Sequence, residues 1–160
     1  MSQVKKRLAR VVRDLLGYDE SIVILGRSNI SYEDFGELLI VIDALTSTPI
    51  GNTPSYDGES EIYDYSSLYI SPCTINVYGN GASGLADRLV QLIQSGRCKD
   101  LQYQHQITVY NPTGITDLEF LAGSQYNERY EIALNAQLTK SVDVEILRID
   151  TPVFNFLNSK

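Results

Sequence analysis

The chain has 160 residues, of which 43% are hydrophobic and 21% are charged, so it has the composition of an ordinary globular domain. Its formal net charge of −7 argues against a protein that grips nucleic acid through the phosphates, because such binding needs clustered Lys and Arg. Cys73 and Cys98 form no metal or redox motif, and no apolar run suits a signal peptide or a membrane span. We therefore expect buried thiols in a chain that folds in the cytoplasm.

Helices are predicted where apolar residues recur with helical spacing. The first spans roughly residues 2–16 and is closed by Gly17, and the second spans 83–95 and ends at Gly96. A further short turn of helix is expected at 99–104. The basic residues of the first helix lie mostly off its apolar stripe, so they form either a solvated face or a surface for an acidic partner. They are Lys5, Lys6, Arg7, Arg10 and Arg13.

Strands are predicted where apolar residues alternate or run together. The run 38–45 is continuous and rich in branched residues, which is typical of a strand covered on both faces. Residues 129–139 alternate most clearly, and 142–149 follow them either as a hairpin partner or as a bulged continuation. The other candidate segments are 22–25, 59–65, 71–78 and 106–110.

The order of these elements predicts the fold class. It is α+β, with a mostly antiparallel or mixed sheet of about five to six strands packed against an N-terminal helix and a central helix. Residues 1–150 are expected to form a single domain. Residues 151–160 are expected to form a C-terminal tail, although Phe154, Phe156 and Leu157 are unusually apolar for free solvent.

A long loop with several turn signals is predicted from Thr46 to Gly58, because this stretch holds two prolines and two glycines. Long ordered loops often carry binding contacts. An acidic group follows at positions 57, 59, 61 and 64. Alternate carboxylates on one side of a strand could bind Ca²⁺ or Mg²⁺, but a solvated edge or an interface also fits, and Gly58 is misplaced for an EF-hand. Polar neighbours argue against a raised pKa and thus against a general acid.

The segment Gly79-Asn80-Gly81-Ala82-Ser83-Gly84 matches the G-x-G-x-x-G pattern of dinucleotide sites, and it lies between a predicted strand and a predicted helix. In such sites the glycines let the backbone approach a pyrophosphate at a helix N-terminus. The following strand should end in an acid that holds the ribose, yet here it ends in Asn111-Pro112, and Asp100 precedes it. The pattern therefore favours a tight turn between strand and helix over a nucleotide site.

Nucleophilic catalysis has little support in the sequence. His105 is the one histidine, it is flanked by glutamines, and no Ser or Cys stands in a nucleophile elbow. No cofactor or metal is expected.

The order of segments resembles the neck or tail-terminator proteins of tailed bacteriophages over roughly residues 4–150. The matching features are the N-terminal helix, the apolar strand 38–45 with its following loop, and Gly58-Glu59-Ser60-Glu61-Ile62-Tyr63-Asp64. They continue with the strand 74–78 and its glycines, then Leu85-Ala86-Asp87-Arg88-Leu89, and a closing strand headed by Arg129 and Tyr130.

The resemblance implies a structural virion protein rather than an enzyme. Such proteins form a ring, expected here to be a hexamer, at the head-proximal end of the tail tube. They end tube growth and join the tail to the head connector or adaptor, and DNA passes through the ring without sequence-specific binding. The alternative is a small nucleotide- or ligand-binding domain or enzyme that uses the Gly79–Gly84 turn. The residues expected to contact a neighbouring subunit, the tube or the pore are Thr48, Asn52, Tyr56, Asp57, Glu59 and Glu61.

Overall fold

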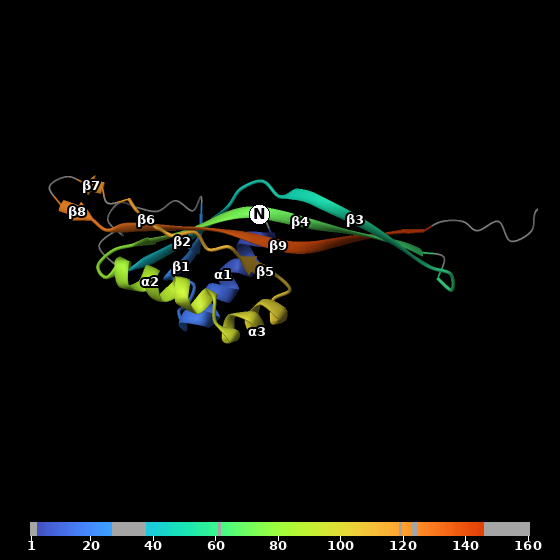
Figure 1. The fold of residues 1–160 in the computed structure, drawn as a ribbon, viewed down its shortest axis with the longest axis horizontal. Coiled ribbons are helices and arrows are strands. Elements are labelled where there is room, and N and C mark those ends of the chain that lie inside the picture. The colour runs from blue at the N-terminus through green and yellow to red at the C-terminus, as the bar shows by residue number, and fades with distance from the viewer. Residues whose placement is uncertain (1–2, 27–37, 61, 119, 123–124, 146–160) are drawn as a thin grey trace, which may run out of the picture.

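The computed structural model describes residues 3–26, 38–60, 62–118, 120–122 and 125–145. Within these ranges the chain forms a seven-stranded mixed sheet, a separate two-stranded sheet and three helices, which all lie on one side of the large sheet (Figure 1). The α+β prediction is confirmed. The large sheet has more strands than expected, because the predicted loop contains a strand at residues 48–57 and a further short strand forms at residues 115–117.

The large sheet is built around two long neighbouring strands, β4 (Ile62–Tyr78) and β9 (Arg129–Glu145), which pair antiparallel over all 17 residues. The edge of β4 that faces away from β9 pairs with β2 (Leu39–Ala44) along one half and with β3 (Thr48–Asp57) along the other, both antiparallel to it. The strand β1 (Val23–Leu25) adds to β2 in parallel. The outer edge of β9 is shared by β5 (Thr108–Tyr110) and β6 (Ile115–Asp117).

The two-stranded sheet consists of β7 (Phe120–Ala122) and β8 (Gln125–Asn127). It lies between β6 and β9 in the sequence and forms a hairpin at the end of the molecule opposite to β3 (Figure 1).

The first helix, α1 (Gln3–Leu16), forms as its apolar stripe predicts, and it ends where Gly17 adopts φ 74°. The second, α2 (Ala82–Ile93), ends at Gln94. The third, α3 (Gly96–Gln104), is longer than the predicted turn, because Ser95 caps its start by accepting a hydrogen bond from the backbone N of Cys98. Gly96 therefore opens α3 instead of closing α2.

One hydrophobic core lies between the helices and the face of the sheet that they cover. Alternate residues of β4 and β9 point into it, as expected for strands with one covered face. The largest fully buried side chains are those of Leu8, Ile40, Ile42, Ile75, Leu89 and Ile132. Leu39 and Val41 are also buried, so β2 is covered on both faces as predicted.

Beyond the helices, three strands continue as a projecting ribbon, which we call the arm (Figure 1). The arm consists of β3, residues 62–70 of β4, residues 137–145 of β9 and the turn that joins β3 to β4. Nine residues of strand extend for about 30 Å. All ten residues of β3 are exposed, so the arm is held by backbone pairing rather than by a core of its own.

The predicted breaks in the long strands are absent. Residues 59–65 and 71–78 were expected as separate strands, yet β4 runs without interruption from Ile62 to Tyr78. The alternative of one continuous strand is correct for β9, which runs through Lys140 and Ser141 to Glu145. The predicted tail, including Phe154, Phe156 and Leu157, lies outside the described residues.

Candidate interaction surface

The residues expected at an interface fall on the arm. Thr48, Asn52, Tyr56 and Asp57 all belong to β3, and Glu59 lies in the turn that follows. Glu61 lies outside the described residues. The prediction of a loop from Thr46 to Gly58 was wrong, because residues 48–57 form the strand β3, and nine of them pair with β4 from Ile62 to Ile70.

The prediction of a loop failed because it rested on turn-forming residues, which an edge strand also tolerates. Proline has no N–H to donate, so within a sheet it is confined to edge strands, strand starts and bulges. Pro49 and Pro54 lie in β3, whose second edge is unpaired in the described sheet. A register shift between Pro49 and Gly51 leaves Ile50 as an extra residue, and this side chain is exposed.

One face of the arm is aromatic and apolar, and it continues the face that forms the core nearer the helices. The Tyr56 and Tyr63 rings have centroids 4.7 Å apart, and those of Tyr63 and Tyr65 are 5.8 Å apart. Val144 lies opposite Tyr63, and Val142 lies opposite Tyr65. We call these five residues the tyrosine face. Four of the five are at least 36% exposed, which identifies an apolar surface that the described residues do not cover.

The other face of the arm carries carboxylates and hydroxyls. Asp64 of β4 lies directly opposite both Ser55 of β3 and Asp143 of β9. Asp57, at the end of β3, lies on the same face. We call Asp57, Asp64 and Asp143 the carboxylate face. Like charges directly opposite on neighbouring strands destabilise a sheet, so the Asp64–Asp143 pair is not there for stability.

The turn at the tip of the arm is built around Asp57. Its carboxylate accepts hydrogen bonds from the backbone N of Glu59 at 3.0 Å and from the Ser60 hydroxyl at 2.7 Å. The Ser60 hydroxyl, followed by the backbone N–H groups, holds the pKa of the Asp57 carboxyl below its ordinary value. Asp57 is therefore an exposed, permanently negative group at neutral pH.

The arm accounts for most of the net negative charge of the molecule. Residues 48–70 and 137–145 contain six carboxylates and one lysine, which makes a formal charge of −5 out of −7 for the whole chain. The lysine is Lys140, whose Nζ lies 4.1 Å from the centroid of the Tyr69 ring, on the face opposite to the carboxylates. The carboxylate face therefore has no cation of its own in the arm.

The acidic group is not arranged as a cation site in the described residues. Asp57 ends a strand and Glu59 lies in a turn, so positions 57 and 59 do not alternate along one strand, and Glu61 lies outside the described residues. No group of three His, Cys, Asp or Glu side chains in the described part of the chain has a geometry that could hold a metal ion.

The glycine turn serves backbone geometry. Gly79 and Gly81 both have positive φ, 94° and 82°, a backbone conformation that glycine adopts without steric cost. Gly81 occupies the N-cap position of α2, and its carbonyl accepts a hydrogen bond from the backbone N of Leu85. A Cβ added at Gly81 or Gly84 would meet nothing within 4 Å, so neither glycine is needed for a close approach to another part of the chain.

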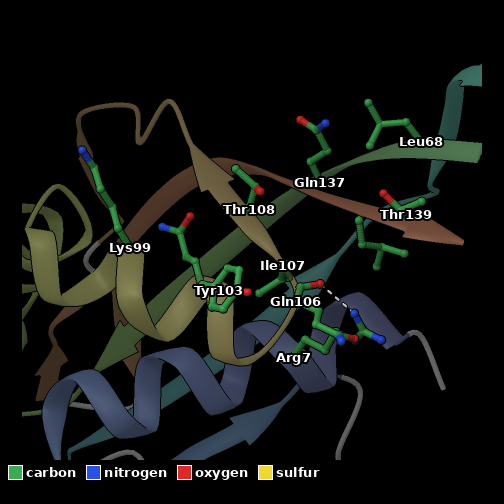
Figure 2. Close-up of a pocket in the computed structure, with 11 residues that line it drawn as sticks. Arg7, Leu68, Lys99, Tyr103, Gln106, Ile107, Thr108, Gln137 and Thr139 are labelled. Atoms are coloured by element: carbon green, nitrogen blue, oxygen red, sulfur yellow. Dashed lines mark hydrogen bonds between the residues drawn. The ribbon is translucent and has the colours of Figure 1, made fainter.

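A cleft of about 530 Å³ lies beside the arm, where β5 begins along the edge of β9 (Figure 2). Its lining residues include Arg7 from α1 and Lys99, Gln102 and Tyr103 from α3. Arg7 donates a hydrogen bond to the carbonyl O of Gln106 at 2.6 Å, drawn dashed in Figure 2. Among the residues that the structure describes, no carboxylate, histidine or cysteine lines the cleft, and its ionisable groups are those of Arg7, Lys99 and Tyr103.

The residues weighed for catalysis have structural contacts instead. The His105 Nε2 atom lies 2.6 Å from the Asp14 Oδ2 atom, which ties the end of α3 to α1. Cys73 and Cys98 are free and buried as expected, and burial raises the pKa of both thiols, that of Cys73 to about 12. Neither thiol is therefore poised as a thiolate nucleophile.

Comparisons with known proteins place the chain in a family. No curated protein matches it significantly. One solved structure with a detectable likeness is the type 4 fimbrial biogenesis protein PilO from Pseudomonas aeruginosa, 13% identical, with a TM-score of 0.29 over 88% of this chain and 70% of that one. None of the described helices is both long and apolar enough to cross a bilayer. A family model described as phage neck terminator protein matches residues 2–160, and this chain therefore belongs to the phage neck terminator protein family.

Proposed function

We propose that this structural phage neck protein forms a homo-oligomeric ring, expected to be a hexamer, at the head-proximal end of the tail tube. The ring ends growth of the tube and joins it to the head connector or adaptor protein. The observation that carries the proposal is the family match over residues 2–160, together with an arm that exposes two chemically different faces and has no core of its own. A closed ring needs two different surfaces on each subunit, because its contacts are heterologous.

The arm supplies the surfaces that such a ring requires. Exposed tyrosines are frequent anchors in interfaces, since the aromatic side chain packs against the partner while its hydroxyl stays solvated. In the proposal, Tyr56 and its neighbours on the tyrosine face contact the tube or the connector. Thr48, Asn52, Asp57, Glu59 and Glu61 belong to the region that, in the proposal, contacts a neighbouring subunit, the tube or the pore.

DNA passes through the proposed ring without being held. The net charge of −7 suits this role, because a negative lumen repels the phosphates where a basic lumen would bind them. In this proposal the protein performs no chemistry and needs no cofactor. It folds in the host cytoplasm and is then built into the virion neck.

The test is to inactivate the gene in the phage and to supply the wild-type protein from a plasmid. Electron microscopy of particles made without the protein is expected to show unjoined heads and tails, with tails of abnormal length. Supplied protein is expected to restore joined particles and to be found at the neck by gold labelling. Joined particles with tails of normal length in the absence of the protein would refute the proposal.

A further inference from the structure

In the described part of the chain, no cation forms an ion pair with the carboxylate face of the arm. Asp64 and Asp143 are cross-strand partners, and Asp57 lies on the same face toward the tip. The ordinary arrangement of a solvated strand pairs opposite charges across it, which stabilises the sheet. Keeping two carboxylates opposite each other costs stability, and a cationic partner that docks on them would reverse that cost.

The same chain presents a cationic surface on its helices. Lys6 and Arg10 lie one helical turn apart on the exposed side of α1, and Lys99 is exposed on α3. In the described part of the chain, no carboxylate lies within ion-pairing distance of these three cations. Two other cations of α1 are already paired, Lys5 with Asp43 and Arg13 with Glu20.

Further donors stand at this surface. Arg7 lines the cleft beside α3, and Arg97 donates a hydrogen bond to the carbonyl O of Asp14. Tyr103 is 89% exposed, so its phenol group is free to meet a partner. We call Lys6, Arg7, Arg10, Lys99 and Tyr103 the cationic surface. Arg and Tyr are the residue types that most often dominate the energy of an interface.

The arm projects beyond the helices of its own subunit (Figure 1), so the carboxylate face and the cationic surface of one molecule face different surroundings. The helices cover the core face of the sheet, and the carboxylates lie on the opposite face. A second copy brings the two surfaces together without any change of fold. Such a contact is heterologous, which is the kind that a ring repeats from subunit to subunit.

We propose that the carboxylate face of one subunit's arm docks on the cationic surface of the next copy of the same chain. This inference rests on the proposed function, since it describes the contact that closes the ring. It names the partner as a second copy of this chain, recognised by carboxylates on one side and by Lys, Arg and Tyr donors on the other.

Charge-swap variants test the contact in assembled particles. D64K/D143K reverses the carboxylate face and keeps a like-charge pair across the strands. K6E/R10E reverses the cationic surface and keeps a like-charge pair on the helix. The matched controls are D87K and R88E, which change exposed charges on α2. Each variant is supplied to phage that lack the gene, and its amount per purified particle is measured by immunoblot and its fold by thermal unfolding.

Each swap alone is expected to lower the amount of protein per particle about tenfold or more. A loss of this size corresponds to a tenfold weaker contact between subunits. The protein that carries both swaps together is expected to regain at least half of the wild-type incorporation, and the α2 controls are expected to match wild type. Restoration in the combined variant would show that the two surfaces meet each other.

Other outcomes overturn the inference. Normal incorporation of either folded swap variant would show that its surface is not in the contact. Loss with D64K/D143K alone would identify another protein as the occupant of the arm. A combined variant no better than the worse single variant would show that the two surfaces do not meet. In that case, particles with heads joined to tails after supply of the wild-type protein would still support the proposed function. Failure of this contact can therefore be told apart from failure of the proposed function.

Discussion

At the scale of single residues, the best determined feature is the packing of α1 on the sheet. Leu8 is 1% exposed and lies in the one core cluster that also includes residues of β2, β4 and β9. The buried stripe is the one that the helical spacing predicts, because a period of 3.6 brings those positions to one side. Local pattern and tertiary packing agree at these residues.

Leu8→Ala is expected to lower the free energy of unfolding by about 2–5 kcal/mol, because it removes buried methyl groups and leaves a cavity. Urea unfolding followed by circular dichroism measures the change. Lys6→Ala on the exposed side of the same helix is the control and should shift stability by less than about 0.5 kcal/mol. Equal effects of the two substitutions would show that α1 does not pack as described.

Gly81→Val is expected to destabilise the fold by about 1–2 kcal/mol, because a side chain there must adopt a left-handed backbone conformation. The φ of 82° causes the loss, since the added Cβ meets no neighbour. Gly84→Ala is the matched control. It lies inside α2, where alanine is expected to stabilise by about 0.5–1 kcal/mol.

Cys73 is expected to resist thiol reagents in the folded protein. Burial raises its pKa from 9.0 to about 12, so the reactive thiolate is scarce at pH 8. The same shift makes stability fall as the pH rises from about 9 towards 12, because the unfolded chain loses the proton first. Labelling of a Cys98→Ala variant with a disulfide reagent, with and without urea, measures the protection. Rapid complete labelling without urea would contradict it.

Among the elements, the arm differs from the rest of the sheet in the interactions that stabilise it. The body packs β4 and β9 under three helices, whereas every described side chain of the arm except Leu138 is exposed or half-buried. A two-stranded ribbon alone is marginally stable in water, and three paired strands without a covered face are little better. The arm therefore depends on its continuity with the body, and its own side chains are free to serve an interface.

A shortened arm separates folding from assembly. Joining Asn52 to Ser67, which are cross-strand partners, through an Asn-Gly turn removes residues 53–66. The core residues are untouched, so the thermal midpoint is expected to change by no more than a few degrees. Particles supplied with this variant are expected to have unjoined heads, as seen by electron microscopy. A folded variant that still yields joined heads with tails of normal length would rule out a role for the arm.

At the scale of the whole molecule, the charge is divided between two regions. The arm carries a formal charge of −5, whereas α1 and α3 together hold seven cations and two carboxylates. This division creates the complementarity that a subunit contact through charges requires. Surface contacts of this kind are screened by salt, since the Debye length falls from about 10 Å at 0.1 M to about 3 Å at 1 M.

Assembly of purified subunits is therefore expected to weaken as salt rises. Native mass spectrometry and light scattering at matched protein concentration follow the oligomer between low and high ionic strength. The arm-shortened variant is the control. It is expected to form oligomers of few subunits, whose size does not depend on salt. Oligomers of the wild type that grow with salt would indicate a contact dominated by apolar surface instead.

Local patterns in the sequence are enough to predict the two main helices and the buried strands. An example is the alternation from Tyr130 to Leu138, which a single segment displays without reference to its partners. The family resemblance rests instead on the order of the segments. The strand β3 could not be predicted in this way. Its ten residues are all exposed and include Pro49 and Pro54, so no alternation marks them, and only backbone pairing with β4 makes them a strand.

The tertiary structure also decided the arrangement of the candidate surface. Residues 64 and 143 are far apart in the sequence, and only the register of β4 with β9 places their carboxylates opposite each other. The same register collects Tyr63, Tyr65, Val142 and Val144 on the other face. Register follows from the pairing of the buried halves of both strands, because a slip by one residue would turn Ile75 and Ile132 out of the core. The body of the sheet thus determines the chemistry of the arm.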